Sequence, residues 1–366
     1  MKPGYRIAFF GSSLVSAYWN GAATYYRGLI RALHERGAEI CFYEPDAYER
    51  QQHRDIADPD WARVRVYPAK EDQALKMVEE ARDADLVVKA SGIGVFDELL
   101  ERAVLDARKP GSVVAFWDVD APATLERIEA NPSDPFRALI SNYDLIFTYG
   151  GGDPVVRGYQ RAGARLCVPI YNALDESTHY PVAPDLRFEA ALAFLGNRLP
   201  DREARVCEFF FCAAELCPNE RFIIGGNGWD TRAMSPNVRW AGHVYTKDHN
   251  AFNSTPRMVL NICRDSMVRF GFSPPTRLFE AAGAAACLIT DAWEGIELFL
   301  EPGKEVLVAH DSKQVAEFLR YVTLEQAQCI GQAARTRILS EHTYAHRAAK
   351  VERVLEGKSY HHRGAI

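Results

Sequence analysis

The sequence lacks the features of membrane, secreted and nucleic-acid-binding proteins. Its 366 residues contain no run of 18 apolar residues and no apolar signal core near the N-terminus. We therefore expect no transmembrane segment and a cytoplasmic location. Lys and Arg number 43 against 49 Asp and Glu, a net charge of −6, which leaves no broad basic field to attract nucleic acid or anionic lipid.

Two common site signatures are also missing. None of the eight cysteines forms a C-x-x-C pair, so reduced thiols are expected instead of a disulfide framework or a metal site. The first long loop, GSSLVSAYWNGAAT, has no G-x-G-x-x-G spacing, which argues against a dinucleotide-dependent enzyme.

What the sequence does contain is a regular alternation of short apolar segments and amphipathic stretches. YRIAFFG reads as a buried strand, and TYYRGLIRALHERG reads as a helix that ends at Gly37. Alternation of this kind predicts α/β domains with mostly parallel sheets. It is interrupted by the polar, proline-bearing segment YNALDESTHYPVAPDL and then resumes.

The predicted fold is therefore two Rossmann-like doubly wound domains that face a cleft, with ligands at the carboxyl ends of the strands. The predicted boundaries are an N-terminal, acceptor-side domain at 1–172, a linker at 173–187 and a C-terminal nucleotide-sugar-binding domain at 188–340. A last amphipathic helix at 341–357 and a flexible tail at 358–366 complete the chain.

Three loops of the first half carry candidate substrate contacts. Asn20 and Gly21 precede a helix whose N-terminal amides suit an anion or a sugar hydroxyl, although a plain connection is the alternative. Gly151 lies in the glycine run of TYGGGDP, which indicates either a close approach to a ligand or a structural turn. Asp118 and Asp120 follow an apolar strand, where one of them could deprotonate a hydroxyl or Asp120 could cap the next helix.

In the second half, polar residues again follow apolar strands. Asn197 and Arg198 end FLGNR, where an arginine can grip a diphosphate with two hydrogen bonds or remain a solvated charge. His243 ends VRWAGHV and is either a ligand contact or a surface histidine.

The stretch GFSPPTRLFEAAGAAACLITD predicts a helix that holds an anion. Ser273 suits the N-cap, and the amides of Thr276 and Arg277 would then point outward beside the positive helix end. Glu280 follows Arg277 by three residues and shares its face, so its carboxylate can accept from ribose hydroxyls. The alternative is a surface ion pair worth less than about 1 kcal/mol.

Taken together, these segments resemble the nucleotide-binding half of GT-B glycosyltransferases, and more narrowly the CgeB-like, glycosyltransferase group 1-like proteins. The resemblance is carried by FLGNRLPDR, TRLFEAAGAAACLITD and ELFLEPGKEVLVAHD, and by FWDVDAPATL and DLIFTYGGGDPVVRGYQRAGA in the first half. It implies that Glu280 binds the donor ribose, that Arg277 and Arg198 face the diphosphate, and that the final helix packs back on the N-terminal domain.

The resemblance further implies an enzyme of the hexosyltransferase type, EC 2.4, that needs no cofactor and no metal. Its donor would be a nucleotide-diphosphate sugar, and its acceptor an unidentified hydroxyl compound. Asp118 and Asp120 have D-x-D spacing, but they lie in the wrong domain for the donor phosphates. Phe272 stands where many retaining members carry a glutamate, which favours an inverting mechanism without settling it.

Two other classes of function stay open at this point. One is a non-catalytic protein that binds a nucleotide or a sugar on the same fold. The other is an epimerase or phosphorylase of GT-B architecture. The sequence does not reveal the sugar, the nucleotide base, the acceptor or the oligomeric state.

Overall fold

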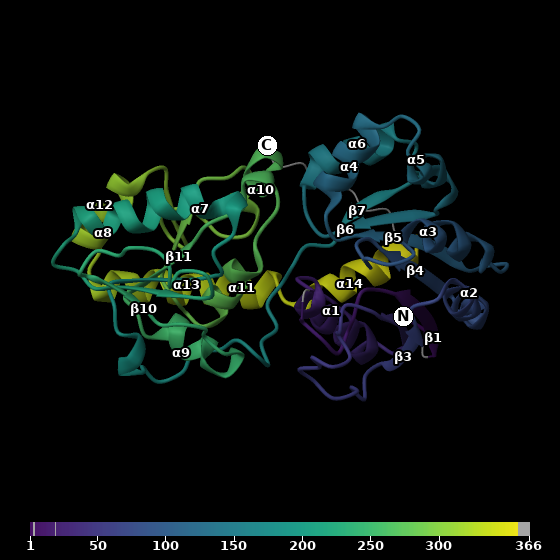
Figure 1. The fold of residues 1–366 in the computed structure, drawn as a ribbon, viewed down its shortest axis with the longest axis horizontal. Coiled ribbons are helices and arrows are strands. Elements are labelled where there is room, and N and C mark those ends of the chain that lie inside the picture. Colours follow the sequence, from purple (N-terminus) through teal and green to yellow (C-terminus); the bar gives the residue numbers. More distant parts are fainter. Residues whose placement is uncertain (3, 19, 358–366) are drawn as a thin grey trace. The chain divides into compact units, whose positions relative to one another are not determined.

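The computed structural model describes residues 1–357 except 3 and 19, so the predicted flexible tail, 358–366, lies outside the described residues. The chain divides into two compact units (Figure 1). One comprises Met1–Tyr171 together with the chain from Tyr344 onward, and the other comprises Asn172–Thr343. Each unit is built around one parallel sheet.

The first unit has a seven-stranded sheet in the order β3-β2-β1-β4-β5-β6-β7, with every pair of neighbours parallel. The central strands are mostly apolar runs, as expected where helices cover both faces of a sheet, whereas the edge strand RVRVYP alternates Arg and Val and is mostly exposed or half-buried. Their bounds are β1 (Tyr5–Phe10), β2 (Ala38–Asp46), β3 (Arg63–Pro68), β4 (Leu86–Ala90), β5 (Val113–Asp118), β6 (Leu145–Thr148) and β7 (Cys167–Pro169).

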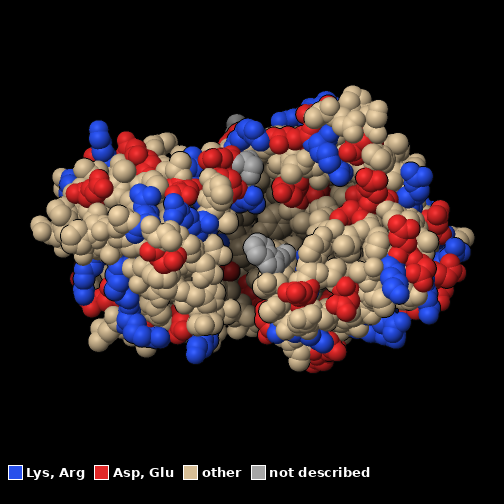
Figure 2. All heavy atoms as spheres, in the orientation of Figure 1, with Lys and Arg blue, Asp and Glu red and all other residues tan. Residues whose placement is uncertain are grey.

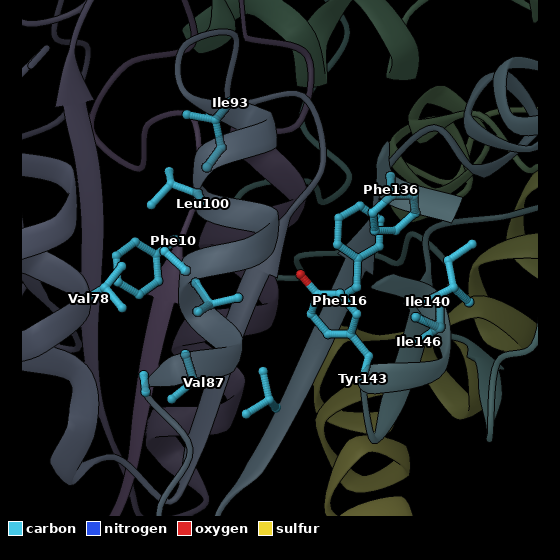
Figure 3. Close-up of a cluster of buried hydrophobic side chains, with 14 of the residues drawn as sticks. Phe10, Val78, Val87, Ile93, Leu100, Phe116, Phe136, Ile140, Tyr143 and Ile146 are labelled. Carbon is cyan, nitrogen blue, oxygen red and sulfur yellow. The ribbon is translucent and has the colours of Figure 1, made fainter. Parts of the chain in front are cut away.

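Helices connect these strands and enclose a core in which aromatic rings of the sheet meet aromatic rings of the helical layer. Figure 3 shows Phe116 of β5 beside Phe136 and Tyr143, and the Phe116 and Phe136 ring centroids are 4.3 Å apart. The α-helices are α1 (Ala23–Glu35), α2 (Glu71–Glu80), α3 (Asp97–Asp106), α4 (Ala121–Ala130), α5 (Pro135–Leu139), α6 (Gly152–Arg161) and α14 (Tyr344–Leu355).

Helix α14, the last described helix, packs along α1 within this unit. The contact is close because α1 has a glycine at the crossing. A Cβ atom placed on Gly28 would lie 2.2 Å from ring carbons of Tyr344. The ring of Tyr344 also meets that of Tyr25 at a centroid distance of 6.2 Å.

The second unit has a six-stranded parallel sheet in the order β10-β9-β8-β11-β12-β13. Its strands are β8 (Leu192–Leu195), β9 (Phe222–Gly225), β10 (Val238–Trp240), β11 (Met258–Asn261), β12 (Leu288–Asp291) and β13 (Leu307–Ala309). Its α-helices are α7 (Pro200–Val206), α8 (Ala213–Leu216), α9 (His249–Ser254), α10 (Asp265–Phe270), α11 (Thr276–Gly283), α12 (Ser312–Tyr321) and α13 (Leu324–Glu341). A π-helical stretch, Cys207–Cys212, joins α7 to α8.

Both sheets have the doubly wound strand order, in which the chain starts in the middle, builds one side and then returns to build the other. The fold class predicted from the sequence is confirmed in both units. The order reverses between β1 and β4 in the first sheet and between β8 and β11 in the second. Ligands of open α/β sheets bind outside the carboxyl ends of the strands at such switch points.

Three further observations concern disulfide bonds, membrane-spanning helices and surface charge, which the sequence analysis addressed. All eight cysteines are free of disulfide bonds. Within the described part of the chain, no helix combines the length and the apolarity that crossing a bilayer requires. On the face drawn in Figure 2, acidic and basic side chains are interspersed, and neither sign forms a broad field.

Candidate functional site

Helix α11 begins at Thr276, two residues later than the sequence pattern predicted. Pro275 takes the N-cap position in an extended conformation, with φ −69° and ψ 152°. A residue that precedes a proline is driven away from the helical region, so Pro274 cannot be the first helical residue. Ser273 is buried and donates its hydroxyl to the carbonyl of Gly271 at 3.0 Å, so its predicted N-cap role is wrong.

The shift leaves Thr276 and Arg277 as the first two residues of an eight-residue helix, at its positive end. Thr276 Oγ1 accepts a hydrogen bond from Nδ2 of Asn172, the first residue of the second unit. The residue just before the predicted linker, 173–187, thus contacts the start of α11.

Arg277 and Glu280 lie on one face of α11, as their spacing predicts. Nη2 of Arg277 is 4.0 Å from Oε2 of Glu280, and the side chains are only 18% and 15% exposed. Nη1 of Arg277 is buried and has no hydrogen-bond partner among the described residues. Burial lowers the pKa of Arg277, and the nearby carboxylate of Glu280 opposes that shift. This is not a solvated surface pair, because both charges are largely removed from water.

A second arginine, Arg202 of α7, contributes to the same positive region. It donates from Nη2 to the carbonyl of Asn197 at 2.7 Å, and its guanidinium lies 5.6 Å from the ring centre of Phe194. Burial, and next the positive charge of Arg277, lower the pKa of Arg202 to about 10. Nε of Arg202 is buried without a partner among the described residues. The fold therefore holds two guanidinium groups near each other with donor capacity unused.

Two histidines surround the carboxylate of Glu280. Nε2 of His179 lies 3.8 Å from Oε1 of Glu280, and one ligating atom from each of His179, His249 and Glu280 lies within 4.8 Å of the others. Burial would raise the pKa of Glu280, but the electrostatic influence of His179, Arg277 and His249 outweighs burial and lowers that pKa. Burial is also the main reason that the pKa of His249 is lowered.

The other predicted donor contacts lie near the carboxyl ends of β8 and β10 but are differently engaged. Arg198 donates to Glu203 Oε1 at 2.6 Å and to Thr231 Oγ1 at 3.1 Å, so a diphosphate would have to compete with these partners. The Oδ1 of Asn197 accepts from the backbone N–H of Asn227 at 3.0 Å. His243 is exposed and lines a cavity of about 640 Å³ that also includes residues of the edge strand β10. The donor-binding roles of these three residues remain predictions.

In the first unit, Asp118 and Asp120 differ in exposure. Asp118 ends β5 and is completely buried, and its carboxylate accepts hydrogen bonds from Ser91 Oγ, Tyr159 Oη and the N–H of Asp120. Asp120 is exposed at the N-cap of α4, where its side chain makes no capping hydrogen bond. Of the two residues, Asp120 is the one exposed to solvent.

The candidate substrate residues of the first unit have evident structural partners. The amide of Asn20 donates to the carbonyls of Ser13 and Ser16 at 2.7 and 3.0 Å and accepts from Ser12 Oγ, so it pins its own loop. Gly151 has φ 85°, and a Cβ there would lie 2.0 Å from Cγ2 of Val155, so the turn itself requires glycine. At Gly21, no atom of the surrounding structure lies within 4 Å of the position that a Cβ would take. Substrate binding by these residues remains a prediction.

Sequence reasoning did not identify Arg202, His179 or His249 as site residues. Arg202 was visible as a charge just after the loop of Arg198, but its distance from Arg277 in the chain concealed their proximity. His179 lies in the segment interpreted as a linker, and His249 begins the short helix α9. No local spacing joins these positions, because the fold alone brings them to Glu280.

Comparisons with known proteins bear on the fold and on the family of the chain. Residues 202–363 match the model of the glycosyl transferase-like family. HepE of Anabaena, solved in complex with UDP, superposes with a TM-score of 0.69 at 14% identity, over 96% of this chain and 100% of the other. Sucrose-phosphate synthase of Thermosynechococcus elongatus gives 0.67 at 12% identity, over 96% and 98%.

The trehalose-6-phosphate protein of E. coli, bound with UDP-2-fluoro glucose, gives a TM-score of 0.66 at 11% identity, over 96% of this chain and 99% of that one. No curated protein matches the sequence. These structural matches establish the fold, and with the family model they confirm the resemblance to GT-B glycosyltransferases. The narrower resemblance to the CgeB-like group remains a prediction.

Proposed function

We propose that this GT-B-fold chain, whose C-terminal part matches the glycosyl transferase-like family, transfers a sugar from a nucleotide-diphosphate sugar to a hydroxyl acceptor. The donor binds the second unit at the start of α11. The acceptor binds the loops at the carboxyl edge of the first sheet. A hexosyl donor and a cytoplasmic location belong to the same proposal.

The observation that carries the proposal is a pair of half-buried arginines, each with one buried nitrogen that has no hydrogen-bond partner among the described residues. A buried cation with unused N–H donors costs free energy unless an anion completes its hydrogen bonds. Arg277 and Arg202 each have a buried nitrogen without a partner among the described residues, and the charge of Arg277 acts on Arg202. A diphosphate supplies the two negative groups that such a site lacks.

The helix end and Glu280 explain why the anion would be part of a nucleotide. The first amides of α11 and the positive end of its dipole favour phosphate oxygens beside Arg277. Glu280 lies one turn further along the same face, and the lowered pKa of its carboxyl group keeps it ionised at neutral pH. An ionised carboxylate only accepts hydrogen bonds, which suits the paired hydroxyls of a ribose.

In the transfer step, negative charge grows on the diphosphate as its bond to the sugar breaks. Arg277, Arg202 and the helix amides are fixed before the reaction, so they stabilise that charge without reorganising. These groups replace the metal ion that other phosphate-binding sites use, which is why the proposed transfer is independent of metal.

Asp120 is the proposed base that removes the proton from the acceptor hydroxyl, because it is the exposed member of the carboxylate pair. Asp118 is proposed to act as a positioning residue. Its Oδ1 accepts the backbone N–H of Asp120 at 3.0 Å and the hydroxyl of Ser91 at 2.7 Å, which holds the turn that presents Asp120.

Thermal shift with UDP-, GDP-, dTDP- and ADP-sugars tests donor binding, because a ligand that binds only the folded state raises its melting temperature. We expect one nucleotide to stabilise the protein and the matching sugar nucleotide to be hydrolysed slowly without acceptor. Binding without any hydrolysis would favour a non-catalytic binding protein. Stabilisation by none of the four would contradict the proposed function.

A further inference from the structure

Three residues from separate parts of the second unit form what we term the imidazole–carboxylate cluster. His179 comes from the segment that precedes β8, His249 is the first residue of α9, and Glu280 belongs to α11. One nitrogen of each ring and one carboxylate oxygen lie within 4.8 Å of one another. The ring centroids of the two histidines are 6.4 Å apart.

One ring nitrogen of His179 is held by a neighbour, and the other faces the carboxylate. Thr178 Oγ1 lies 3.1 Å from the carbonyl of Asp175 and 2.9 Å from Nδ1 of His179. These contacts hold the ring with Nε2 at 3.8 Å from Oε1 of Glu280. When Nδ1 carries the proton of the neutral ring, Nε2 presents its lone pair to the carboxylate.

A lone pair opposite a carboxylate oxygen is unfavourable unless a cation lies between them. The distance of 3.8 Å is longer than an N–H···O hydrogen bond, so a proton alone does not close the gap well. Two ligands that share one tetrahedral zinc ion, with bonds of about 2.0–2.2 Å, lie roughly 3.4 Å apart. The observed gap is therefore close to the spacing of two ligands on one ion.

The ring of His249 is also held through one of its nitrogens. The carbonyl of Val244 lies 3.3 Å from Nε2 of His249, and a carbonyl only accepts, so Nε2 carries the proton and Nδ1 of the neutral ring carries the lone pair. Histidines that bind metals commonly have their second nitrogen held by such a neighbour, which fixes the ring and its tautomer. Both histidines of the cluster have such a partner.

We propose that His179, His249 and Glu280 bind a divalent transition-metal ion, for which Zn²⁺ is the reference. Two imidazole nitrogens and one carboxylate oxygen form a ligand set that zinc accepts, with a fourth position open to water. Arg277 lies 4.0 Å from the other oxygen of Glu280, Oε2, whereas the His179 contact is made on Oε1. The ion is thus placed on the side of the carboxylate away from the closest approach of the guanidinium.

Metal binding would make Glu280 unavailable to a nucleoside. This consequence rests on the proposed function, in which the same carboxylate accepts the ribose hydroxyls. Zinc and the nucleotide then compete, and the ion acts as an inhibitor at a position different from that of the donor diphosphate.

Calorimetric titration of the full chain with ZnCl₂ tests the site. His361 and His362 are replaced by alanine in all samples to remove an adjacent histidine pair from the titration. We expect one ion per chain, and His179→Ala or His249→Ala should weaken binding at least about 100-fold. Thr178→Val removes the partner of Nδ1 and should weaken it about 10- to 100-fold.

His310→Ala serves as the matched control, because His310 is an exposed histidine outside the cluster, and it should leave zinc affinity unchanged. Melting curves of each variant without metal exclude misfolding. Zinc binding that survives both His179→Ala and His249→Ala would overturn the proposal.

A second titration with UDP separates the two proposals. Zinc should weaken UDP binding in the parent protein and should have no effect on UDP binding by His249→Ala. If zinc binds at the cluster but UDP fails to bind even without zinc, the metal site stands and the nucleotide assignment fails. If zinc and UDP bind together without mutual effect, the competition is refuted.

Discussion

Replacement of Arg277 by methionine separates its proposed role in ligand binding from its effect on stability. Methionine keeps much of the side-chain volume but removes the charge and the donors. An interaction between a charged donor and a phosphate oxygen contributes about 1.5–3 kcal/mol. We therefore expect Arg277→Met to weaken nucleotide-diphosphate binding by about 10- to 150-fold.

The same substitution should not destabilise the ligand-free protein. Arg277 is 18% exposed, and its closest carboxylate oxygen is 4.0 Å away. The folded protein therefore holds this charge largely out of water without a short ion pair, and an apolar replacement of a buried charge is often neutral or stabilising. Glu280 retains His179 and His249 as neighbours. The melting temperature without ligand should stay constant or rise.

Calorimetry with the nucleotide that gives the largest thermal shift measures the affinity, and scanning calorimetry measures the stability. Arg221→Met is the matched control, because Arg221 is 67% exposed, pairs with Glu189 and precedes β9 at the amino end of the sheet. It should change neither quantity by more than about 0.5 kcal/mol. If Arg277→Met binds the nucleotide within twofold of the parent protein, the anion site is misplaced.

Three further substitutions test separate parts of the structure. Gly28→Ala should lower the free energy of unfolding by about 1–3 kcal/mol, because the new Cβ would lie 2.2 Å from the ring of Tyr344. Urea unfolding measures this change, and a variant as stable as the parent would show that α14 packs differently. Asp120→Asn should reduce kcat by about 10²- to 10⁴-fold in steady-state assays and leave donor affinity unchanged, whereas an unchanged kcat would exclude it as the base. The pKa of Glu280 is lower in the folded protein than in the unfolded chain, where it is about 4.3. The ionised carboxylate therefore stabilises the folded protein above about pH 4.3, and this stabilisation is lost as the pH falls through the folded-state pKa. The stability difference between parent and Glu280→Gln should therefore shrink only below about pH 4.3, and a difference that disappears near neutral pH would contradict the lowered pKa.

The strands were predictable because a parallel sheet covered on both faces requires short, continuously apolar segments. The apolar parts of two such segments, IAFF in β1 and LI in β12, are buried in strands as expected. Residues 200–216 form one continuous helical segment, and the π-helical turn within it has no signature in the apolar periodicity of the sequence.

The start of α11 shows where local rules compete. Ser273 and Pro274 fit the preferences of an N-cap and a first helical residue when each is considered alone. The second proline, Pro275, overrides them, because it forces the residue before it into an extended conformation. The rule needed for the correct start was available from the sequence.

The surroundings of the candidate site could not be predicted from one sequence. Asp118 and Asp120 are separated by one residue, yet burial by the surrounding fold leaves one enclosed and the other exposed. Likewise, His179, His249 and Glu280 meet only because the segment before β8, α9 and α11 pack together. Such proximity is a property of tertiary packing, and no spacing rule along the chain encodes it.

A crystal structure of the protein with UDP would locate the nucleotide. We expect the diphosphate at the first turn of α11, within hydrogen-bond distance of Arg277, and the ribose hydroxyls on the carboxylate of Glu280. A nucleotide bound elsewhere, or bound without contact to Arg277 and Glu280, would show that α11 is not the donor site.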